Sequence, residues 1–531
     1  MKYLIGIDFG TLSARAILTN ETGDIISQSS SNYAHGVMDG ATFGTNKPSC
    51  AIQHPDDYIE ALSYLTRKVV ADSGVDVSDI VGIGIDFTSC TVLPVDDNEV
   101  PVCKNPAFDK DMHAYVKLWK HHGGEKYADK MQEVAIARGE SWLNRYGGKI
   151  SCEFALPKII ETLNESPSVW SNTARFVEAG DWIVGKLIDK KVQSGVFSGY
   201  KWCWEKTSGY PSNDYLVAVD DRLDGIVGGK ILDSVTTDTS IGTIGEYGSK
   251  LTGLKVGTAV SIPVIDAHSA LPALGAVGEG DMMLIIGTSG CQIVNSAKQL
   301  DMTGVFGWVK DSIIQGLYTY EAGQTAVGDI FEWVVNNFVT DEYRQEAKSR
   351  GINIHAFLRQ KASSLKVGES GLICLDWLNG NRSILNDASL KGAIFGLTLD
   401  TKPEEVYRAF IEATAFGVKV IVDNYRSYGI EISNIFAGGG IAKKDPLLMQ
   451  IYADVLDMPI IVPDCDQAGA LGSAIYGAVA SGLYGSVSEA SKVMQAKNAT
   501  TYTPIEQNAK AYSIEYLRYK SLHDVFSKRE A

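Results

Sequence analysis

A β-strand that breaks into a turn of glycine and small hydroxyl residues occurs twice in this sequence. The first copy is Ile5-Gly-Ile-Asp-Phe-Gly-Thr-Leu-Ser13 and the second is Leu284-Ile-Ile-Gly-Thr-Ser-Gly290. Recurrence of a strand-and-turn unit over a long interval is typical of a duplicated architecture. Because the interval is about the length of one large α/β domain, the recurrence predicts two similar halves.

The rest of the sequence predicts an α/β fold. Short apolar runs alternate with longer stretches whose apolar residues recur every three to four positions, as strands alternate with helices. Strands are expected at 3–8, 80–87, 260–266 and 283–287, and helices at 55–73, 404–427 and 444–457. Pro55 opens the first helix and Gly74 ends it. We place the domain boundary near residue 258, which gives domains 1–258 and 259–531.

The composition supports large folded cores and restricts the partners. Hydrophobic residues make up 45% of the 531 residues and charged residues 21%, near the averages of globular proteins. Acidic residues outnumber basic ones by 64 to 48, a formal net charge of −16. Such a balance repels phosphate backbones and anionic lipid, so we expect neither a nucleic-acid nor a membrane partner.

Two further features predict a cytoplasmic protein. The eight cysteines occur singly, with no CxxC pair, which indicates free thiols in a reducing compartment. The uncharged stretch 468–485 approaches the length of a membrane span, but glycine, alanine and serine dominate it. Such a segment is too weakly apolar to insert, so we expect a closely packed buried helix capped by Asp466.

The two recurring turns are candidates for holding phosphate. Gly10, Thr11 and Ser13 follow a strand directly, and Arg15 adds a positive charge nearby. A turn of glycine and small hydroxyl residues can point successive backbone N–H groups at a phosphate without an intervening Cβ. Taken alone, such a turn is more often an ordinary β-hairpin. The second copy, 287–290, favours a phosphate role, because two such turns can face each other across a cleft.

A third glycine cluster, Gly438-Gly-Gly440, lies between an apolar run and a helical pattern. A glycine turn between a strand and a helix lets a flat ligand approach the backbone closely. The alternative is a plain helix start, with Asp445 as the cap and Pro446 at the first helical position. The sequence contains neither a P-loop motif nor a complete GxGxxG, which argues against P-loop and Rossmann nucleotide sites.

Two aspartates lie at the ends of predicted strands. Asp266 ends the apolar run 260–265, where a carboxylate can project into a cleft and accept a hydroxyl proton during phosphoryl transfer. Its competing role is an N-cap for the helix that follows. Asp8 lies at the first turn and can hold Mg²⁺ directly or through water. Its competing role is a structural hydrogen bond to that turn.

Taken together, the motifs resemble those of a known family. The order IGIDFGT, a strand ending in Asp266, IIGTS and AGGGIAKKDPLLMQIYADVLDMPI is similar to the actin-like ATPase fold in its FGGY branch of carbohydrate kinases. Within that branch, the chain resembles members that act on L-ribulose, through DFGTLSARA, QHPDDYIE, GIGIDFTSCT, AYVKLWKHH, RYGGKISCE, GYKWCW, IDAHSA and YEAGQTAVGD. Kinases for glycerol or xylulose usually carry Gln-Arg-Glu or Gln-Met-His-Gly where this chain has 86–91.

The resemblance implies two actin-like ATPase domains of the ribonuclease H-like type that flank a central cleft. It implies an enzyme that uses ATP and Mg²⁺ to phosphorylate L-ribulose to L-ribulose 5-phosphate in L-arabinose breakdown. Asp266 would be the general base, and Asp8 and Asp266 would hold the magnesium. Phosphate would be contacted by Gly10, Thr11, Ser13, Arg15, Gly287 and Thr288, adenosine by Gly438 and Gly439, and the sugar by Ser89, Trp119, Lys201, Asp266 and Glu321.

Without the resemblance, these sugar-site residues have ordinary alternatives. A pentulose pocket needs fixed donors and acceptors and a flat apolar wall, and these residue types supply them. Trp119 is otherwise expected in the core of an aromatic helix, and Lys201 and Glu321 as a solvated pair. The pair His121-His122 is expected on a helix, where adjacent side chains point in different directions and have a solvated or structural role.

The chain departs from the general family pattern at two places. Glu153 and Ala155 stand where relatives usually keep small, aromatic or hydroxyl residues, although Pro157-Lys158 is retained. Lys443-Lys444 stands where many relatives have a small residue or asparagine. The second departure bears on the base and ribose contacts but not on the glycine turn.

The sequence leaves two other functions open. One is another FGGY pentulose or polyol kinase, because one change in a pocket can redirect the choice of sugar. The other belongs to a different class, an actin-like ATPase switch or filament protein, against which the segments SCT, KLWKHH and YKWCW speak. Asp86 and His268 are expected in supporting positions around the site. Helices near 404–427 and 508–527 suit a homodimer contact and internal packing equally.

Overall fold

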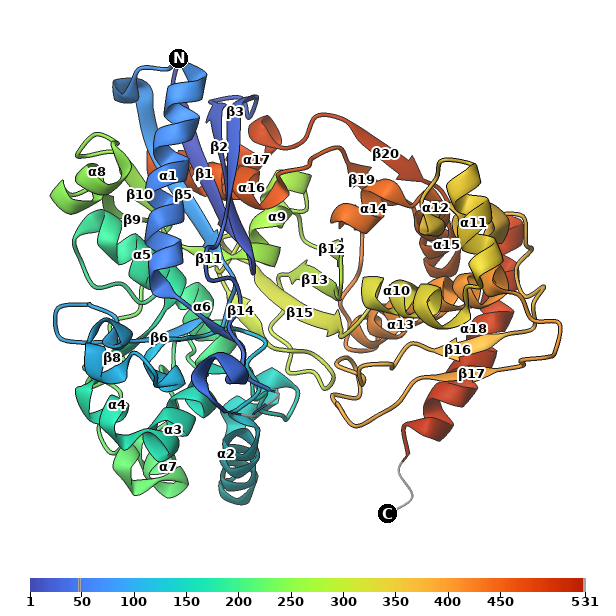
Figure 1. Ribbon diagram of the computed structural model, residues 1–531, viewed down its shortest axis with the longest axis horizontal. Helices are drawn as coiled ribbons and strands as arrows, with labels where there is room; N and C mark the ends of the chain where they lie inside the picture. Colours follow the sequence, from blue (N-terminus) through green and yellow to red (C-terminus); the bar gives the residue numbers. More distant parts are fainter. Residues whose placement is uncertain (46, 48, 529–531) are drawn as a thin grey trace. The chain divides into compact units, whose positions relative to one another are not determined.

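The structure is a computed structural model that describes residues 1–45, 47 and 49–528 (Figure 1). The chain divides into two compact units that alternate along the sequence. Unit 1 comprises Met1–Val277, Gly307–Thr319 and Gln467–Gln495, and unit 2 comprises Gly278–Phe306, Tyr320–Asp466 and Ala496–Ala531. The continuous domains expected from the sequence, 1–258 and 259–531, stay a prediction.

Unit 1 is built on a mixed sheet. In spatial order its strands are β3 (Ile25–Asn32), β2 (Ser13–Asn20), β1 (Tyr3–Phe9), β5 (Ile80–Phe87), β10 (Ala259–Ser261) and β9 (Ser240–Thr243), with β11 (Val264–Ile265) also beside β5. Strands β1, β5, β10 and β11 run parallel, whereas β2, β3 and β9 pair antiparallel with their neighbours. The single strand expected at 260–266 is therefore two short strands, because Pro263 has no N–H to donate to a ladder.

Helix α16 (Ala468–Ala480) packs on β1 and β5, and α1 (Pro55–Ser73) packs on β2 and β3. The contact of α16 is so close that it requires glycine in the strands. A Cβ on Gly6 would lie 1.8 Å from the carbonyl oxygen of Ala470, and one on Gly84 would lie 1.8 Å from that of Ser473. The expected buried helix in this stretch is confirmed, and its small residues serve this close packing.

The expected cap of this helix is wrong. Gln467 occupies the N-cap position of α16, with no side-chain capping bond. The side chain of Asp466 pairs with Lys443 instead. The start and end of α1 are confirmed, since Pro55 is its first residue and Gly74 follows its last in the left-handed conformation.

A second, smaller sheet in unit 1 has the order β4 (Ile52–Gln53), β7 (Val116–Lys117), β6 (Val92–Val95) and β8 (Arg175–Glu178). The helices of this region are α2 (Glu125–Arg138), α3 (Ala155–Glu165), α4 (Pro167–Asn172), α5 (Ala179–Ile188), α6 (Gly195–Lys201), α7 (Asn213–Val219) and α8 (Glu246–Thr252). An apolar core that includes Tyr146, Phe154 and Trp202 joins many of them. The remaining elements of unit 1 are α9 (Asp266–Leu274), β14 (Trp308–Lys310) and α17 (Val487–Met494).

Unit 2 repeats the central arrangement of unit 1. Its main sheet contains, in order, β15 (Tyr318–Gln324), β13 (Gly290–Ser296), β12 (Asp281–Ile286), β18 (Asn434–Gly438), β19 (Ile460–Pro463) and β20 (Ala499–Tyr502). Strands β12 and β13 form an antiparallel hairpin, and β12 runs parallel to β18, just as β1 pairs with β2 and β5. The prediction of two similar α/β halves is therefore confirmed.

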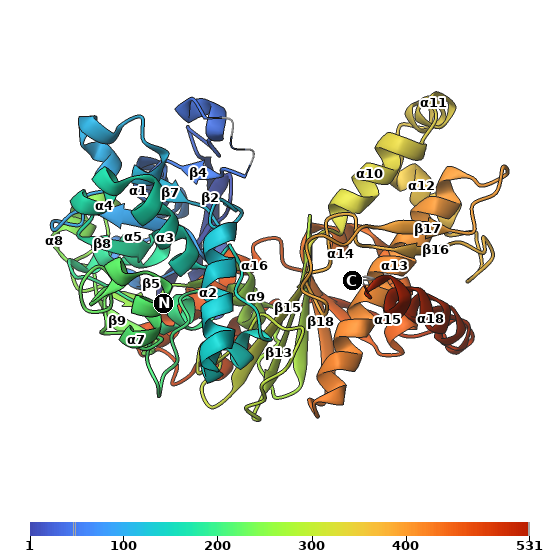
Figure 2. The same cartoon turned by 90° about the horizontal axis from the view of Figure 1, so that it is seen from below.

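The helices of unit 2 surround this sheet and a small two-stranded one (Figure 2). They are α10 (Gly328–Phe338), α11 (Asp341–Ser349), α12 (Ile354–Ala362), α13 (Pro403–Ser427), α14 (Gly440–Lys444), α15 (Pro446–Leu456) and α18 (Glu506–Phe526), and the small sheet pairs β16 (Ile373–Leu375) with β17 (Ala393–Phe395). Helix α13 packs on α10, α12 and α15, and α18 packs on α13, α15 and β16. Both helices considered for a dimer thus pack within unit 2.

Several smaller features complete the fold. Short 3-10 helices span Gly40–Phe43, Val77–Asp79, Val102–Lys104, Pro106–Phe108, Met112–Ala114, Ser141–Tyr146 and Asp221–Leu223. All eight cysteines are free thiols, as predicted. Among the helices of the described chain, none has both the length and the apolar character needed to cross a membrane.

Replacing Gly84 with alanine is expected to lower the free energy of unfolding by about 1–3 kcal/mol, because the added methyl group overlaps a backbone carbonyl of α16. Urea denaturation measures this change. Gly440→Ala is the matched control, since a Cβ at Gly440 meets no atom within 4 Å. Equal stabilities of the two variants would show that the contact of α16 with β5 tolerates a side chain.

Candidate active site

Three carboxyl groups meet at the ends of three parallel strands in unit 1. Asp8 in β1 is in register with Asp86 in β5, and Asp86 is in register with Val264 in β11. Asp266 directly follows β11. The two outer aspartates were expected at the site, whereas Asp86 was expected only in support. The signal for Asp86 lies in the sequence, because the tetrapeptide Ile-Gly-Ile-Asp occurs at 5–8 and again at 83–86.

Asp86 is the buried member of this group. Its Oδ2 atom accepts a hydrogen bond of 2.8 Å from Ser473 Oγ of α16, and the carboxyl group is also hydrogen-bonded to Asp8. Burial and the charges of Asp8 and Asp266 raise the pKa of Asp86 well above its ordinary value. Burial therefore favours the protonated form of Asp86 more strongly than that of Asp8. Asp8 is the more exposed of the two, with a fifth of its side-chain surface accessible to solvent.

Asp266 is the first residue of α9, and the N-cap position belongs to Ile265. The role of N-cap considered for Asp266 is therefore wrong by one residue. Its Oδ1 atom accepts a 2.8 Å hydrogen bond from the N–H of Ala267. A carboxylate at the first turn of a helix is stabilised by the unpaired N–H groups and the helix dipole there. The neighbouring candidate His268 is fully buried, with its ring packed edge-on against Tyr200.

The first glycine turn is a β-hairpin next to these carboxyl groups. Gly10 N–H donates to the carbonyl of Ser13 at 3.0 Å and joins β1 to β2. Thr11 is held from two sides, because its Oγ1 accepts from Trp119 Nε1 at 3.2 Å and its carbonyl from Gln53 Nε2 at 2.7 Å. Arg15, half exposed, lies 3.9 Å from Asp8. The turn at Gly10 is thus a β-hairpin, and this geometry is compatible with the predicted phosphate contact.

The second turn lies in unit 2 and joins β12 to β13. Gly287 N–H donates to the carbonyl of Ser289 at 3.0 Å. The glycine turn after β18 lies directly against it, since a Cβ on Gly439 would lie 2.4 Å from the carbonyl oxygen of Ile286. Gly439 also has a φ of 95°, which strongly favours glycine. The predicted phosphate turn at Thr288 and the predicted adenosine turn are thus neighbours in one unit.

The plain helix start considered for the third glycine cluster is also present. Asp445 caps α15 through the N–H of Leu448, and Pro446 is its first residue. A short additional helix, α14, occupies 440–444. Lys443 in that helix forms an ion pair of 2.7 Å with Asp464 as well as pairing with Asp466. This departure from the family pattern is therefore engaged in surface ion pairs.

The sugar-site candidates divide between the units. Ser89 lies in the turn after β5, Trp119 lies in a turn after β7 rather than in a helix, and Lys201 ends α6. Lys201 is buried, with 5% of its surface exposed. The alternative expectation that Lys201 is solvated is therefore wrong. Glu321 lies in β15 of unit 2 and is partly buried. In the other departure from the family pattern, Glu153 is 3.6 Å from His122.

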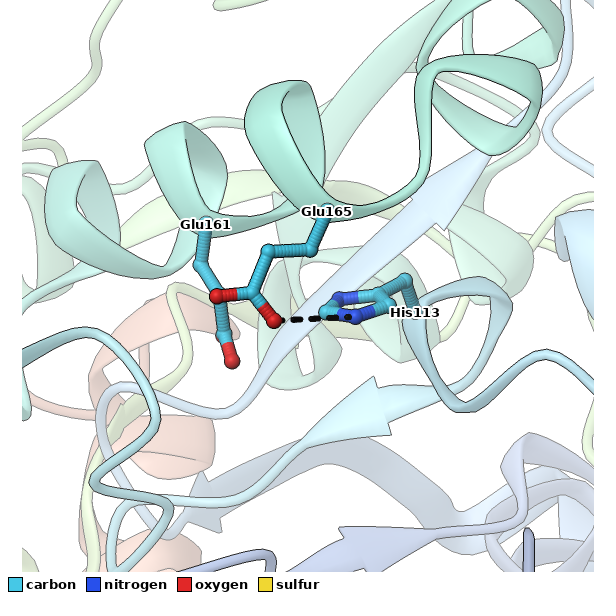
Figure 3. Close-up of side chains that lie close together, drawn as sticks. All are labelled: His113, Glu161 and Glu165. Atoms are coloured by element: carbon cyan, nitrogen blue, oxygen red, sulfur yellow. Dashed lines mark ion pairs between the residues drawn. The ribbon is translucent and has the colours of Figure 1, made fainter. Parts of the chain in front are cut away.

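A cluster of His113, Glu161 and Glu165 has the residue types of a metal site (Figure 3). Ammonium and imidazole groups already surround its carboxylates. Glu161 Oε2 lies 2.8 Å from Lys117 Nζ and 2.9 Å from His121 Nε2, and Glu165 pairs with Lys126 at 3.0 Å and with Lys47. A divalent cation would meet three positive charges here, so the geometry indicates a structural charge cluster.

The protonation states agree with this interpretation. Burial acts to raise the pKa of Glu161, but Lys117 and His121 lower it well below its ordinary value. Burial lowers the pKa of His113 to about 3, so its imidazole is neutral. His121 is fully buried while His122 is half exposed, so the two side chains do point apart, but they lie in a turn and not on the expected helix.

Replacing Glu161 with glutamine is expected to lower the free energy of unfolding by about 3–5 kcal/mol, because the buried Lys117 loses its counter-charge. The double variant Glu161→Met with Lys117→Met should lose less than Glu161→Gln, since it leaves no buried charge unpaired. Asp72→Asn, which breaks an exposed pair with Lys68, is the control and should change stability far less. Urea denaturation measures all three. A chelator that lowered the stability of the wild-type protein would contradict a structural role and indicate a metal.

Comparison with known proteins finds two family domains along the chain. The model of the FGGY family of carbohydrate kinases, N-terminal domain, matches residues 3–198, and that of the C-terminal domain matches 282–481. A ribulokinase of Halalkalibacterium halodurans is 43% identical, covering 99% of this chain and 95% of its own. Ribulokinase 2 of Staphylococcus saprophyticus is 44% identical, covering 100% and 98%.

Solved structures show the same fold at lower identity. The ligand-bound xylulose kinase from Lactobacillus acidophilus has a TM-score of 0.81 at 18% identity, covering 100% of this chain and 99% of its own. Xylulose kinase from Rhodospirillum rubrum has a TM-score of 0.79 at 21% identity, covering 99% and 100%.

The two matching sheets, each with a hairpin of glycine and hydroxyl residues, define the class of actin-like ATPase folds with two ribonuclease H-like domains. The chain belongs to the FGGY family of carbohydrate kinases. It is an ATP-dependent sugar kinase, and both predictions from the sequence are confirmed.

Two further buried side chains were not assigned from the sequence. Lys158 of α3 and Glu178 of β8 are fully buried and bind the segments that carry the sugar-site candidates. The available signals were the retained Pro157-Lys158 pair and a glutamate that directly follows the apolar residues Phe176 and Val177. Neither signal shows burial by itself.

Proposed function

We propose that this kinase transfers the γ-phosphoryl group of MgATP to the terminal hydroxyl of L-ribulose, which yields L-ribulose 5-phosphate. The observation that carries the proposal is the meeting of Asp8, Asp86 and Asp266 at the ends of three parallel strands, beside the turn at Thr11. The choice of sugar rests on relatives named ribulokinase that align over nearly their whole length.

Asp266 is the proposed general base. Phosphoryl transfer needs a carboxylate that accepts the proton of the attacking hydroxyl while other groups neutralise the charge that spreads over the phosphoryl oxygens. Asp266 is held at a helix N-terminus by the N–H of Ala267. This bond fixes the direction of the carboxylate at the start of α9.

The donor set at the strand ends fits Mg²⁺, which prefers carboxylate oxygens and retains part of its water shell. Asp8 and Asp266 are the residues that would hold the ion, which supplies charge neutralisation to the phosphates when bound. Asp86 supports Asp8 from the buried side, while a fifth of the Asp8 side-chain surface stays exposed. Gly10, Thr11, Ser13 and Arg15 would contact phosphate on the same side.

In unit 2, the two adjacent glycine turns form the proposed nucleotide site. Gly287 and Thr288 would contact phosphate, and Gly438 and Gly439 the adenosine. Gly439 supports this assignment, because its backbone passes within contact distance of β12 and leaves no room for a side chain. Backbone N–H groups in such turns bind phosphate without a P-loop lysine.

The sugar would be bound by Ser89, Trp119, Lys201 and Glu321. Lys201 supports this role, because it is buried at the end of α6 and its ammonium group has several N–H donors for sugar oxygens. Trp119 is partly buried and its indole N–H is bonded to Thr11, so its ring is fixed next to the phosphate turn. An oriented ring of this kind provides the flat apolar wall that a sugar site needs.

Replacing Asp266 with asparagine is expected to lower kcat for L-ribulose by about 10²–10⁴-fold, because the amide cannot accept the hydroxyl proton. The affinity for metal-free ATP, measured with a fluorescent nucleotide, should stay unchanged. Asp233→Asn is the control, since Asp233 is exposed and lies outside the site. A turnover of Asp266→Asn close to that of the wild type would exclude Asp266 as the base.

A panel of sugars tests the substrate. The wild-type protein should release ADP in the presence of Mg²⁺ with L-ribulose and far more slowly with D-xylulose, ribitol or glycerol, measured by a coupled assay. A higher kcat/KM for one of the other acceptors would assign a related pentulose or polyol kinase. ADP release that needs no sugar would favour the ATPase switch class instead.

A further inference from the structure

Lys158 is a buried charge that joins two loops of unit 1. Its Nζ atom donates hydrogen bonds to the carbonyl oxygens of Cys90 at 2.7 Å and Leu118 at 2.8 Å. Cys90 lies in the turn between β5 and β6, and Leu118 directly follows β7. Cys90 has a φ of 56°, so its carbonyl points where an extended backbone would not place it. A single ammonium group thus holds the backbone of two segments that are 28 residues apart in the sequence.

Glu178 joins a second pair of segments beside the first. Its Oε2 atom accepts the backbone N–H of Thr91 at 2.9 Å, and its Oε1 atom accepts the indole N–H of Trp202 at 2.7 Å. Thr91 belongs to the same turn as Cys90, and Trp202 directly follows α6. Both Lys158 and Glu178 are fully buried. The turn 88–91 is therefore held by both charges.

Each residue that Lys158 or Glu178 binds lies one or two positions along the sequence from a proposed sugar-binding residue. Cys90 and Thr91 follow Ser89, Leu118 precedes Trp119, and Trp202 follows Lys201. None of the four bonds involves the proposed sugar-binding side chains themselves. The two buried charges therefore act on the backbone and on a neighbouring indole.

The bonds hold the segments more firmly than neutral bonds would. Hydrogen bonds with an ionised partner are shorter and stronger than neutral ones, and removing the partner leaves buried backbone groups unpaired. Burial raises the pKa of Glu178 and lowers that of Lys158, while each charge partly offsets this for the other. Either charge alone would be costly in this core, so the two depend on each other.

We propose that Lys158 and Glu178 are positioning residues for the sugar site, which hold Ser89, Trp119 and Lys201 in one arrangement without touching the sugar. The inference rests on the proposed function for the identity of the sugar. It predicts that loss of either charge weakens use of the sugar more than binding of the nucleotide. The proposed nucleotide contacts at Thr288 and Gly439 lie in unit 2, and of the proposed phosphate contacts only the turn at Thr11 is joined to a segment that the two charges hold, through Trp119.

The kinetic test compares Lys158→Met and Glu178→Gln with the wild-type protein. We expect KM for L-ribulose to rise at least tenfold in each, with KM for ATP changed less than threefold. Trp202→Phe removes only one bond to Glu178 and should give a smaller rise in the same direction. Lys201→Met, which removes a proposed contact, is the positive reference.

The matched control is Arg175→Met. Arg175 lies at the other end of β8, is also buried, and pairs with Glu99 and with the carbonyl of Val192 at 2.9 Å, away from the sugar-site segments. It should lower the melting temperature without changing KM for the sugar. An equal rise of KM in Arg175→Met and Lys158→Met would overturn the proposal, because the effect would then be general destabilisation.

A measurement without substrate separates this inference from the proposed function. In Lys158→Met, hydrogen exchange should become at least tenfold faster in peptides that cover 88–91 and 117–121, and stay unchanged there in Arg175→Met. If the sugar panel assigns another acceptor, the KM comparison is made with that sugar. Unchanged exchange in both segments of Lys158→Met would overturn the positioning role whatever the substrate. If Lys158→Met does not fold, Glu178→Gln decides, with KM for the sugar and exchange in the peptide that covers 88–91 as the two readouts.

Discussion

The contact between α16 and the central sheet of unit 1 is the constraint on which the candidate active site depends. Glycine at positions 6 and 84 lets the helix backbone approach β1 and β5 at a distance that excludes any side chain. This approach brings Ser473 of α16 within 2.8 Å of Asp86. A Cβ on Gly469, near the start of the helix, would lie 3.1 Å from the carboxyl carbon of Asp8. The contact of α16 with β1 and β5 therefore determines both the packing of unit 1 and the surroundings of Asp8 and Asp86.

Buried charge serves two different purposes in unit 1. Around Glu161, cations compensate anions in a cluster that contains no proposed ligand contact. The charges lower the pKa of Glu161 against burial, whereas burial prevails at the pKa of His113. Around Lys158 and Glu178, charges are used on backbone groups and an indole, so they fix the shape of loops. The distinction comes from the partners, because Glu161, Lys158 and Glu178 are all fully buried.

Sequence and structure agree best where the chemistry is local. The turns at Gly10 and Gly287, the capping of α15 by Asp445, and the limits of α1 all depend on residues within a few positions, and they lie as expected. The expectations that failed depend on distant partners. Asp466 pairs with Lys443 rather than capping α16, and Lys201 is buried rather than solvated. The site residues themselves stay predictions until the variants are measured.

The sequence by itself determined the two-sheet α/β architecture and the glycine turns, because hydrophobic periodicity and backbone conformational preference act over a few residues. The sequence also indicated the protein family, through motifs that are spread along the chain. Only the tertiary structure decided that Asp86 is buried beside Asp8 and that Lys158 reaches the carbonyls of Cys90 and Leu118. Those interactions join segments that are far apart in the chain, and burial, which gives them their strength, exists only once the sheets and helices have packed.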